Sequence, residues 1–169
     1  MASTLATAGG RDAARPAGAG VPHPIRGGRF EGMDLTDPRA VEALKDAARA
    51  QERAYAPYSG FRMGAAVVTA ANDVVPGALV ENVSLGLAMC AERAAMFGVV
   101  ARGLARPEVL ALVSPRTGGE LTWPCGACLQ VGMELAGPDL WVVVSDGRSE
   151  PREARLSDLA GRLPYKGSA

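Results

Sequence analysis

Residues 90–102, CAERAAMFGVVAR, decide the predicted fold. Ala, Met, Phe and Val fall on nearly every face of the helix that this stretch predicts, and Gly103 provides its C-cap. A helix that is apolar on all sides is a central, buried one. We therefore expect this helix to lie at the centre of the domain.

Strands and helices alternate on both sides of this helix. The expected strands cover residues 63–69, 74–82, 109–114, 140–145 and 153–155. The expected helices run from Asp37-Pro38 to about Tyr55, from Cys90 to about Arg102 and from Pro124 to about Ala136, with a closing helical turn at 157–163. The alternation predicts an α/β fold, and the opening hairpin makes its sheet mixed. We predict a three-layer α-β-α architecture with a mixed, roughly five-stranded sheet.

The start of the chain differs in composition from the rest. Residues 1–33 are dominated by Ala, Gly, Arg and Pro, with hardly any large apolar residue before Phe30. Such a segment cannot bury enough surface to offset the entropy lost on ordering. We expect a disordered leader over residues 1–33, without the apolar core of a signal peptide, and one folded domain over residues 34–169.

Charge and hydropathy restrict the partners. The 18 Lys and Arg residues balance the 18 Asp and Glu residues, which argues against a nucleic-acid partner. No run of eighteen apolar residues exists, so no membrane span is predicted. An odd number of cysteines without an export signal favours a reducing compartment, and we expect a soluble, cytoplasmic protein.

The chain has three cysteines, Cys90, Cys125 and Cys128, and one distant histidine, His23. Cys125 and Cys128 are three residues apart, so they share one face at the first turn of the predicted helix. Cys90 begins the other helix, and both helix N-termini favour thiolates. Three thiolates without a fourth protein ligand predict a hydrolytic zinc site with an open coordination position.

Two charged residues follow Cys90 directly in the sequence. Glu92 is too close to Cys90 to bind the same metal, so we expect it to face the open position and to transfer a proton there. Arg93 is expected to offset the charge of the thiolates. Three alternatives are disfavoured: reduced core cysteines do not explain the Cys-x-Glu motif, a structural zinc site lacks its fourth ligand, and a thioredoxin-like pair needs neither Cys90 nor Glu92.

Four segments together resemble the small homotetrameric zinc-dependent cytidine deaminases, near the blasticidin S deaminases. They are YAPYSGFRMGAA at 55–66, VEN at 80–82, CAER at 90–93 and PCGACLQ at 124–130. The resemblance extends from about Leu35 to Leu163. It implies a cytidine deaminase-like fold, a homotetramer, one zinc ion per chain and a small-molecule nucleoside substrate.

The resemblance also implies a role for each matching residue. The zinc ligands would be Cys90, Cys125 and Cys128. Glu92 would be the catalytic proton shuttle and Arg93 would balance the thiolate charge. The backbone of Ala91 would contact the pyrimidine, Phe61 would line its pocket, and Glu81 would bind the 3′-hydroxyl of ribose. The implied reaction is hydrolysis of cytidine or deoxycytidine to uridine or deoxyuridine and ammonia, as in pyrimidine salvage.

Four positions depart from the family pattern. Leu79 replaces an asparagine, Leu85 an aromatic residue, Leu129 an arginine and Gly167 a phenylalanine. These changes concern the sugar and the contact between subunits, whereas the metal motifs are intact. Two alternatives therefore remain open: a zinc deaminase of another aminated heterocycle or modified nucleoside, and a non-catalytic zinc protein of the same fold. The retained Glu92 argues against the second.

Overall fold

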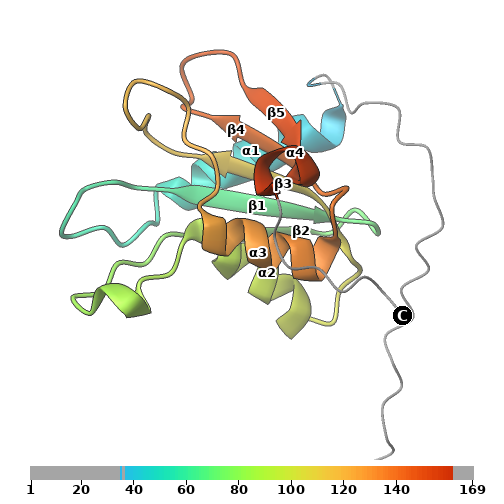
Figure 1. The fold of residues 1–169 in the computed structure, drawn as a ribbon, viewed down its shortest axis with the longest axis horizontal. Coiled ribbons are helices and arrows are strands. Elements are labelled where there is room, and N and C mark those ends of the chain that lie inside the picture. Colours follow the sequence, from blue (N-terminus) through green and yellow to red (C-terminus); the bar gives the residue numbers. More distant parts are fainter. Residues whose placement is uncertain (1–34, 36, 162–169) are drawn as a thin grey trace, which may run out of the picture.

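Five strands form one mixed sheet in the order β2-β1-β3-β4-β5 (Figure 1). The computed structural model describes residues 35 and 37–161. The strands are β1 (Gly64–Thr69), β2 (Val74–Ala78), β3 (Pro107–Val113), β4 (Trp141–Ser145) and β5 (Arg152–Arg155). β3 and β4 are parallel, whereas the other three neighbouring pairs are antiparallel. The predicted mixed five-stranded sheet is confirmed.

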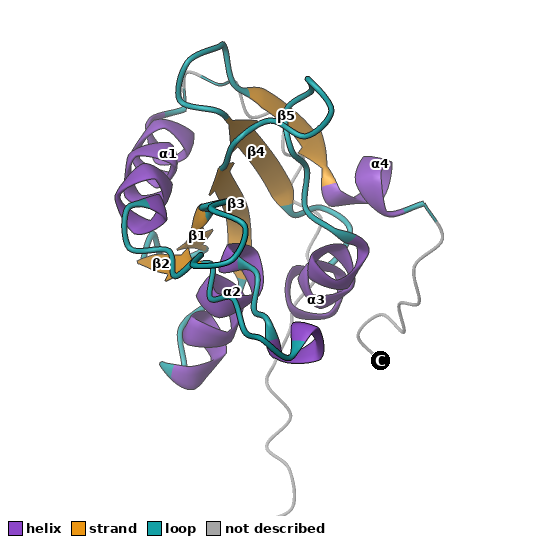
Figure 2. Cartoon of the chain, turned by 90° about the vertical axis from the view of Figure 1, so that its left-hand side faces the viewer, coloured by secondary structure: helices purple, strands orange, loops and turns teal. Residues whose placement is uncertain are grey.

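Helices cover both faces of the sheet. They are α1 (Pro38–Gln51), α2 (Ala91–Ala101), α3 (Gly126–Ala136) and the short α4 (Leu156–Ala160), with a 3₁₀ turn at Leu85–Leu87. α1 lies on one face, and α2 and α3 lie side by side on the other (Figure 2). The predicted three-layer α-β-α architecture is therefore confirmed.

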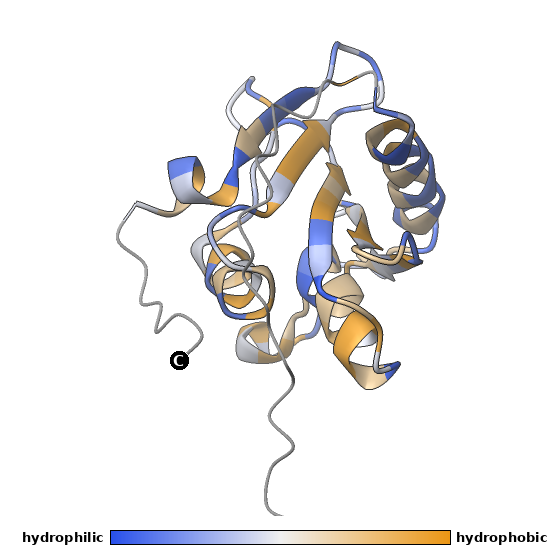
Figure 3. Ribbon diagram, turned by 90° about the vertical axis from the view of Figure 1, so that its right-hand side faces the viewer, coloured by the Kyte–Doolittle hydropathy of each residue, from blue (hydrophilic) through white to orange (hydrophobic). Residues whose placement is uncertain are grey.

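The sequence of α1 accounts for its start and its buried face. The Asp37 carboxylate caps the helix by accepting a hydrogen bond from the Arg39 N–H at 2.7 Å, and Pro38 takes the first position. Four alanines at helical spacing form the buried face: Ala40, Ala43, Ala47 and Ala50. Because these side chains are small, α1 lies close to β1, while its outer face is hydrophilic (Figure 3).

The central strands are buried on both faces. Every residue of β1 and of β4 is buried, and their sequences are almost entirely apolar or small. Two apolar clusters result: one lies under α1, and the larger one lies under α2 and α3. A sheet covered on both faces gives a rigid base for the N-terminal ends of α2 and α3.

Three sequence expectations need correction. The prediction that α2 is buried on every side is wrong, because the side chains of Phe97 and Val100 are 43% and 58% exposed. β2 ends at Ala78 rather than at residue 82, and Val80 makes only isolated bridges. α3 begins two residues after Pro124, because Cys125 takes the extended N-cap conformation.

Some expectations fall on residues outside the described part of the chain. These are the leader at 1–33 with His23, and the tail that contains Gly167. The end of the helical turn predicted at 157–163 also falls there, and its described part is α4. Among the described residues, no helix combines the length and apolar character that crossing a membrane requires.

Candidate metal centre and active site

Two helix N-termini bring the three cysteines together. Cys90 is the N-cap of α2 and Cys125 is the N-cap of α3, and Cys128 follows in the first turn of α3. Both N-cap residues have extended backbone, and neither side chain caps its own helix. Their sulfur atoms are therefore available to a metal, in the partial positive field of two helix ends.

The spacing of the sulfur atoms fits a zinc ion. The Cys90 and Cys125 sulfurs are 4.0 Å apart, and the Cys125 and Cys128 sulfurs are 3.5 Å apart. Two sulfurs that each lie about 2.3 Å from a tetrahedral zinc ion are about 3.8 Å apart. All three ligand atoms lie within 4.8 Å of one another, and no other such His, Cys, Asp or Glu cluster occurs in the described part of the chain. The cluster therefore fits zinc with three thiolates.

The cysteine cluster carries a stabilised negative charge. The pKa of the Cys90 thiol is lowered to about 5, first by its hydrogen bond with Cys128 and then by Arg93. The same hydrogen bond and burial raise the pKa of the Cys128 thiol, which keeps its proton without metal. The Arg93 guanidinium donates from Nη2 to the Cys90 sulfur at 3.8 Å and to the Ala88 carbonyl at 3.3 Å. Metal binding must therefore release a proton.

Glu92 is a buried carboxyl group beside the thiols. Its side chain is 0% exposed, and neither carboxylate oxygen has a hydrogen-bond partner among the described residues. Burial raises the pKa of Glu92 to about 7, and the negative charge of Cys90 acts in the same direction. Buried polar atoms in proteins almost always have a partner. The unpaired carboxyl group therefore points to a missing polar ligand at the cysteine cluster.

A pocket of about 560 Å³ is lined by the segment before β1 and by the segment between β2 and α2. Its wall includes Ala88, whose carbonyl accepts a hydrogen bond from Arg93. Phe61 and Glu81 also line it. The Glu81 carboxylate accepts hydrogen bonds from the Tyr58 N–H at 2.8 Å and from the Ser59 hydroxyl, and these bonds lower its pKa. Glu81 is thus a fixed anionic acceptor in a largely apolar pocket.

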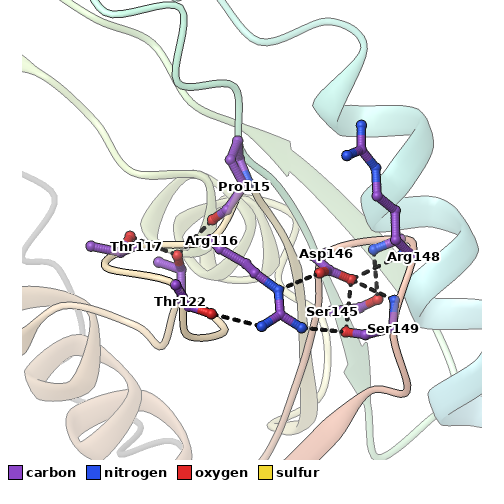
Figure 4. A network of polar contacts seen from close by, with 10 residues as sticks. Pro115, Arg116, Thr117, Thr122, Ser145, Asp146, Arg148 and Ser149 are labelled. Carbon is purple, nitrogen blue, oxygen red and sulfur yellow. Dashed lines mark hydrogen bonds and ion pairs between the residues drawn. The ribbon is translucent and has the colours of Figure 1, made fainter.

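A polar network holds the loop that leads to Cys125 (Figure 4). The Arg116 guanidinium donates from Nε to Asp146 at 2.7 Å, from Nη2 to the Ser149 hydroxyl at 3.0 Å and from Nη1 to the Gly119 carbonyl at 2.7 Å. The Asp146 carboxylate also accepts bonds from the backbone N–H groups of Arg148 and Ser149. These bonds connect the loop after β3 with the loop after β4. The loop after β3 continues directly to Cys125.

The structure groups the predicted site residues in two adjacent places. Five lie together at the helix ends: Cys90, Glu92, Arg93, Cys125 and Cys128. Ala91 is the first residue of α2, whereas Phe61 and Glu81 lie in the neighbouring pocket. The sequence interpretation missed Ser59 and Arg116. Ser59 stands in the Tyr-Ser-Gly turn beside Phe61, which could have indicated it; nothing local indicates Arg116.

Comparison with known proteins agrees with this geometry. Residues 38–144 match the family model described as the cytidine and deoxycytidylate deaminase zinc-binding region. The chain is 39% identical over 116 residues to a cytidine deaminase of Halalkalibacterium halodurans, an alignment that covers 69% of this chain and 86% of that protein. It is 41% identical over 114 residues to a cytidine deaminase of Mycobacterium tuberculosis, covering 68% and 80%.

Solved structures of cytidine deaminases also have this fold. The structure from Burkholderia pseudomallei superposes with a TM-score of 0.68 at 40% identity and covers 73% of this chain and 97% of that one. The structure from M. tuberculosis gives a TM-score of 0.62 at 38% identity, covering 73% and 95%. The matched segment contains α2, α3 and all three cysteines. The chain therefore belongs to the zinc-dependent cytidine deaminase family.

Proposed function

We propose that this protein hydrolyses cytidine and deoxycytidine to uridine and deoxyuridine with release of ammonia, a step of pyrimidine salvage. The observation that carries the proposal is the buried, unpaired Glu92 beside three clustered thiols. A carboxyl group with a pKa of about 7 can both accept and donate a proton near neutral pH. A purely structural zinc site has no use for such a group.

In the proposed mechanism the three cysteines hold one zinc ion per chain, and Arg93 balances part of their charge. When bound, zinc supplies a Lewis acid that lowers the pKa of a coordinated water to about 7. Glu92 receives a proton from the attacking water and passes it to the nucleoside. A bond from oxygen to C4 of the base forms, and the bond from C4 to the amino nitrogen breaks. The amino group leaves as ammonia. The overall reaction thus converts cytidine and water to uridine and ammonia, and its atoms balance.

The remaining site residues bind and orient the nucleoside. Ala91 is the first residue of α2, and the N–H groups at the start of a helix lack partners within it. The Ala91 N–H can therefore donate to the pyrimidine. Phe61 forms part of the pocket wall against which the base packs. Glu81 accepts a hydrogen bond from the 3′-hydroxyl of the sugar. The substrate is thus held between the metal centre and the pocket.

We extend the proposal to a cytoplasmic homotetramer whose catalytic domain spans residues 34–169. Large apolar side chains are exposed on the turn before Cys90 and on α2: Val83, Leu85, Leu87, Phe97 and Val100. Exposed apolar surface of this kind is typical of protein interfaces. The balanced net charge and the absence of a spanning helix among the described residues support neither nucleic acid nor membrane as a partner.

The test is an assay on the purified, metal-loaded protein. We expect about one zinc per chain, loss of the cytidine absorbance band and one ammonia for each uridine formed. Removal of the metal with a chelator should stop the reaction, and added zinc should restore it. A second candidate, deamination of another aminated heterocycle or modified nucleoside, is favoured by the apolar pocket wall at Leu79. Inert cytidine and deoxycytidine with turnover of other aminopyrimidines would select it.

A further inference from the structure

Three residues in the described part of the chain carry buried side-chain atoms without a hydrogen-bond partner: Glu92, Arg93 and Ser114. Glu92 and Arg93 lie in the first turn of α2. Ser114 follows β3 directly, is 2% exposed and takes no part in the proposed mechanism. A buried hydroxyl without a hydrogen bond is costly, and nearly all buried polar groups in proteins have a partner. The surroundings of Ser114 therefore need to be traced.

The side chain of Ser114 faces the layer that contains α2 and α3. Leu110 and Leu112 of β3 belong to the apolar cluster under these two helices. The Ser114 N–H continues the strand pairing, because it donates to the Ser145 carbonyl at 3.1 Å. Side chains alternate along a strand, so Ser114 lies on the same face as Leu112. The two helices lie side by side over this face (Figure 2).

Glu92 lies over the same end of the sheet. An added Cβ at Gly77 of β2 would collide with backbone atoms in the first turn of α2, so this turn lies directly over Gly77. Gly77 pairs with Ala65 of β1, and Ala65 pairs with Leu112 of β3. The turn that carries Glu92 therefore covers the row of residues that ends at Leu112. Ser114 is the next residue of β3 on that face.

The carboxyl group of Glu92 extends from α2 toward α3. Glu92 is 0% exposed, and its charge acts on the Cys128 thiol in the first turn of α3. α3 in turn packs against β3. The Glu92 carboxyl group and the Ser114 hydroxyl thus face the same buried space at the end of β3, and they are not bonded to each other directly. A buried water makes two to four hydrogen bonds and commonly joins polar groups placed in this way.

We propose, on the basis of the function proposed above, that Ser114 is a positioning residue and that one buried water joins its hydroxyl to the Glu92 carboxyl group. A carboxylate has about four acceptor positions, so Glu92 can accept from this water and still act at the open coordination position. The bridge fixes the rotation of the carboxyl group and does not touch the nucleoside. Ser114 should therefore affect the rate of the reaction and not the binding of substrate.

Unfolding of the zinc-free protein tests the bridge independently of the reaction. Removing a buried hydroxyl that has no partner stabilises a protein, whereas removing a hydrogen-bonded one destabilises it. We expect Ser114→Ala to unfold at a lower denaturant concentration than wild type. In a Glu92→Met background, which replaces the carboxyl group by an apolar side chain, Ser114→Ala should no longer destabilise. Increased stability of Ser114→Ala, or an equal loss in both backgrounds, would overturn the inference.

Kinetics of the metal-loaded full chain test the positioning. Ser114→Ala should bind one zinc per chain, and its kcat for cytidine should fall about 2- to 12-fold, as expected for the loss of one hydrogen bond. Its KM should change by less than about 2-fold, because the hydroxyl does not contact the substrate. A fall in kcat without a change in KM separates positioning from a general loss of structure.

Ser145→Ala is the matched control, because Ser145 ends β4 at the same edge of the sheet. Val143 belongs to the apolar cluster under α1, so Ser145 faces α1, and its hydroxyl accepts a bond from the Gly147 N–H at 2.9 Å. Ser145→Ala should keep the wild-type kcat. A wild-type kcat in Ser114→Ala, or an equal fall in both variants, would overturn the inference and leave the proposed function intact. If wild type at full zinc content is inert on cytidine and deoxycytidine, the proposed function is overturned, and the unfolding measurements still decide whether the bridge exists.

Discussion

Gly77 of β2 tests whether the position of the α2 N-terminus controls the reaction. A Cβ atom at Gly77 would lie 2.9 Å from the Cβ of Ala95, and nearer still to the Ala91 carbonyl oxygen and the Ala95 nitrogen. Ordinary contacts begin at about 3.4 Å, so β2 and α2 must separate by about 1 Å in Gly77→Ala. Cys90 and Glu92 begin α2 and move with it.

The expected cost has two parts. Overpacking of this kind lowers the free energy of unfolding by about 1 to 3 kcal/mol. A displacement of about 1 Å at the reacting groups lowers kcat about 100-fold. The matched control is Gly64→Ala in β1, where the added Cβ would lie 2.7 Å from the Gln51 Cα of α1, on the opposite face of the sheet. It should lose similar stability without moving the cysteines.

Both variants are compared with the wild type by thermal unfolding, zinc content and kcat per bound zinc. Gly77→Ala should lose activity about 100-fold per zinc and release zinc faster to a chelator, whereas Gly64→Ala should lose stability only. If the two variants keep equal activity per zinc, the position of α2 does not set the geometry of the site, and the reasoning is refuted.

Three further predictions concern the cysteines, Glu92 and Arg116. Cys125→Ala and Cys128→Ala should both lose zinc, but only the change at Cys128, which is 1% exposed, should also destabilise the zinc-free protein in denaturant titrations; equal destabilisation would contradict this. The pKa of Glu92 is raised in the folded state, so the folded protein favours the protonated carboxyl group more than the unfolded chain does. The stability that Glu92 contributes is therefore complete below about pH 4.5 and is lost as the pH rises through about 7. Between pH 5 and pH 8, zinc-free wild type should therefore lose about 2 to 3 kcal/mol more unfolding free energy than Glu92→Gln, and equal losses would disprove the raised pKa. Arg116→Met should release zinc to a chelator several-fold faster than wild type. The control Arg39→Met breaks the 3.1 Å ion pair with Glu108, away from the site, and should release zinc at the wild-type rate. Identical release rates for the two variants would show that the loop network does not position Cys125.

The clustering of the three cysteines was predictable because its information is local. A three-residue spacing on a helix places Cys125 and Cys128 on one face at its N-terminal end. A helix start at residue 90 or 91 likewise places Cys90 at the N-terminal end of its own helix. Alternating apolar strands and helices likewise predicted the layers and the mixed sheet. The one long-range step, the meeting of the two helix ends, followed from the chemical need of zinc for a third ligand.

Other features depend on contacts that leave no periodic pattern in the sequence. Arg116 and Asp146 are thirty residues apart in two irregular loops, so their ion pair became visible only in the structure. The sequence interpretation wrongly placed the exposed Phe97 and Val100 in the core, because hydrophobicity alone does not distinguish a buried apolar side chain from an exposed one. The end of β2 at Ala78 depends on where its partner β1 begins, at Gly64.

The most direct test of the central claim compares wild type with Glu92→Gln at equal zinc content. The substitution keeps the size of the side chain and removes its ability to carry a proton. Zinc and uridine are measured in the same samples. Glu92→Gln should bind one zinc per chain, and its rate of uridine formation should fall at least 100-fold, since general acid-base catalysis contributes about 100- to 10,000-fold. Wild-type turnover by the zinc-loaded variant would contradict the account.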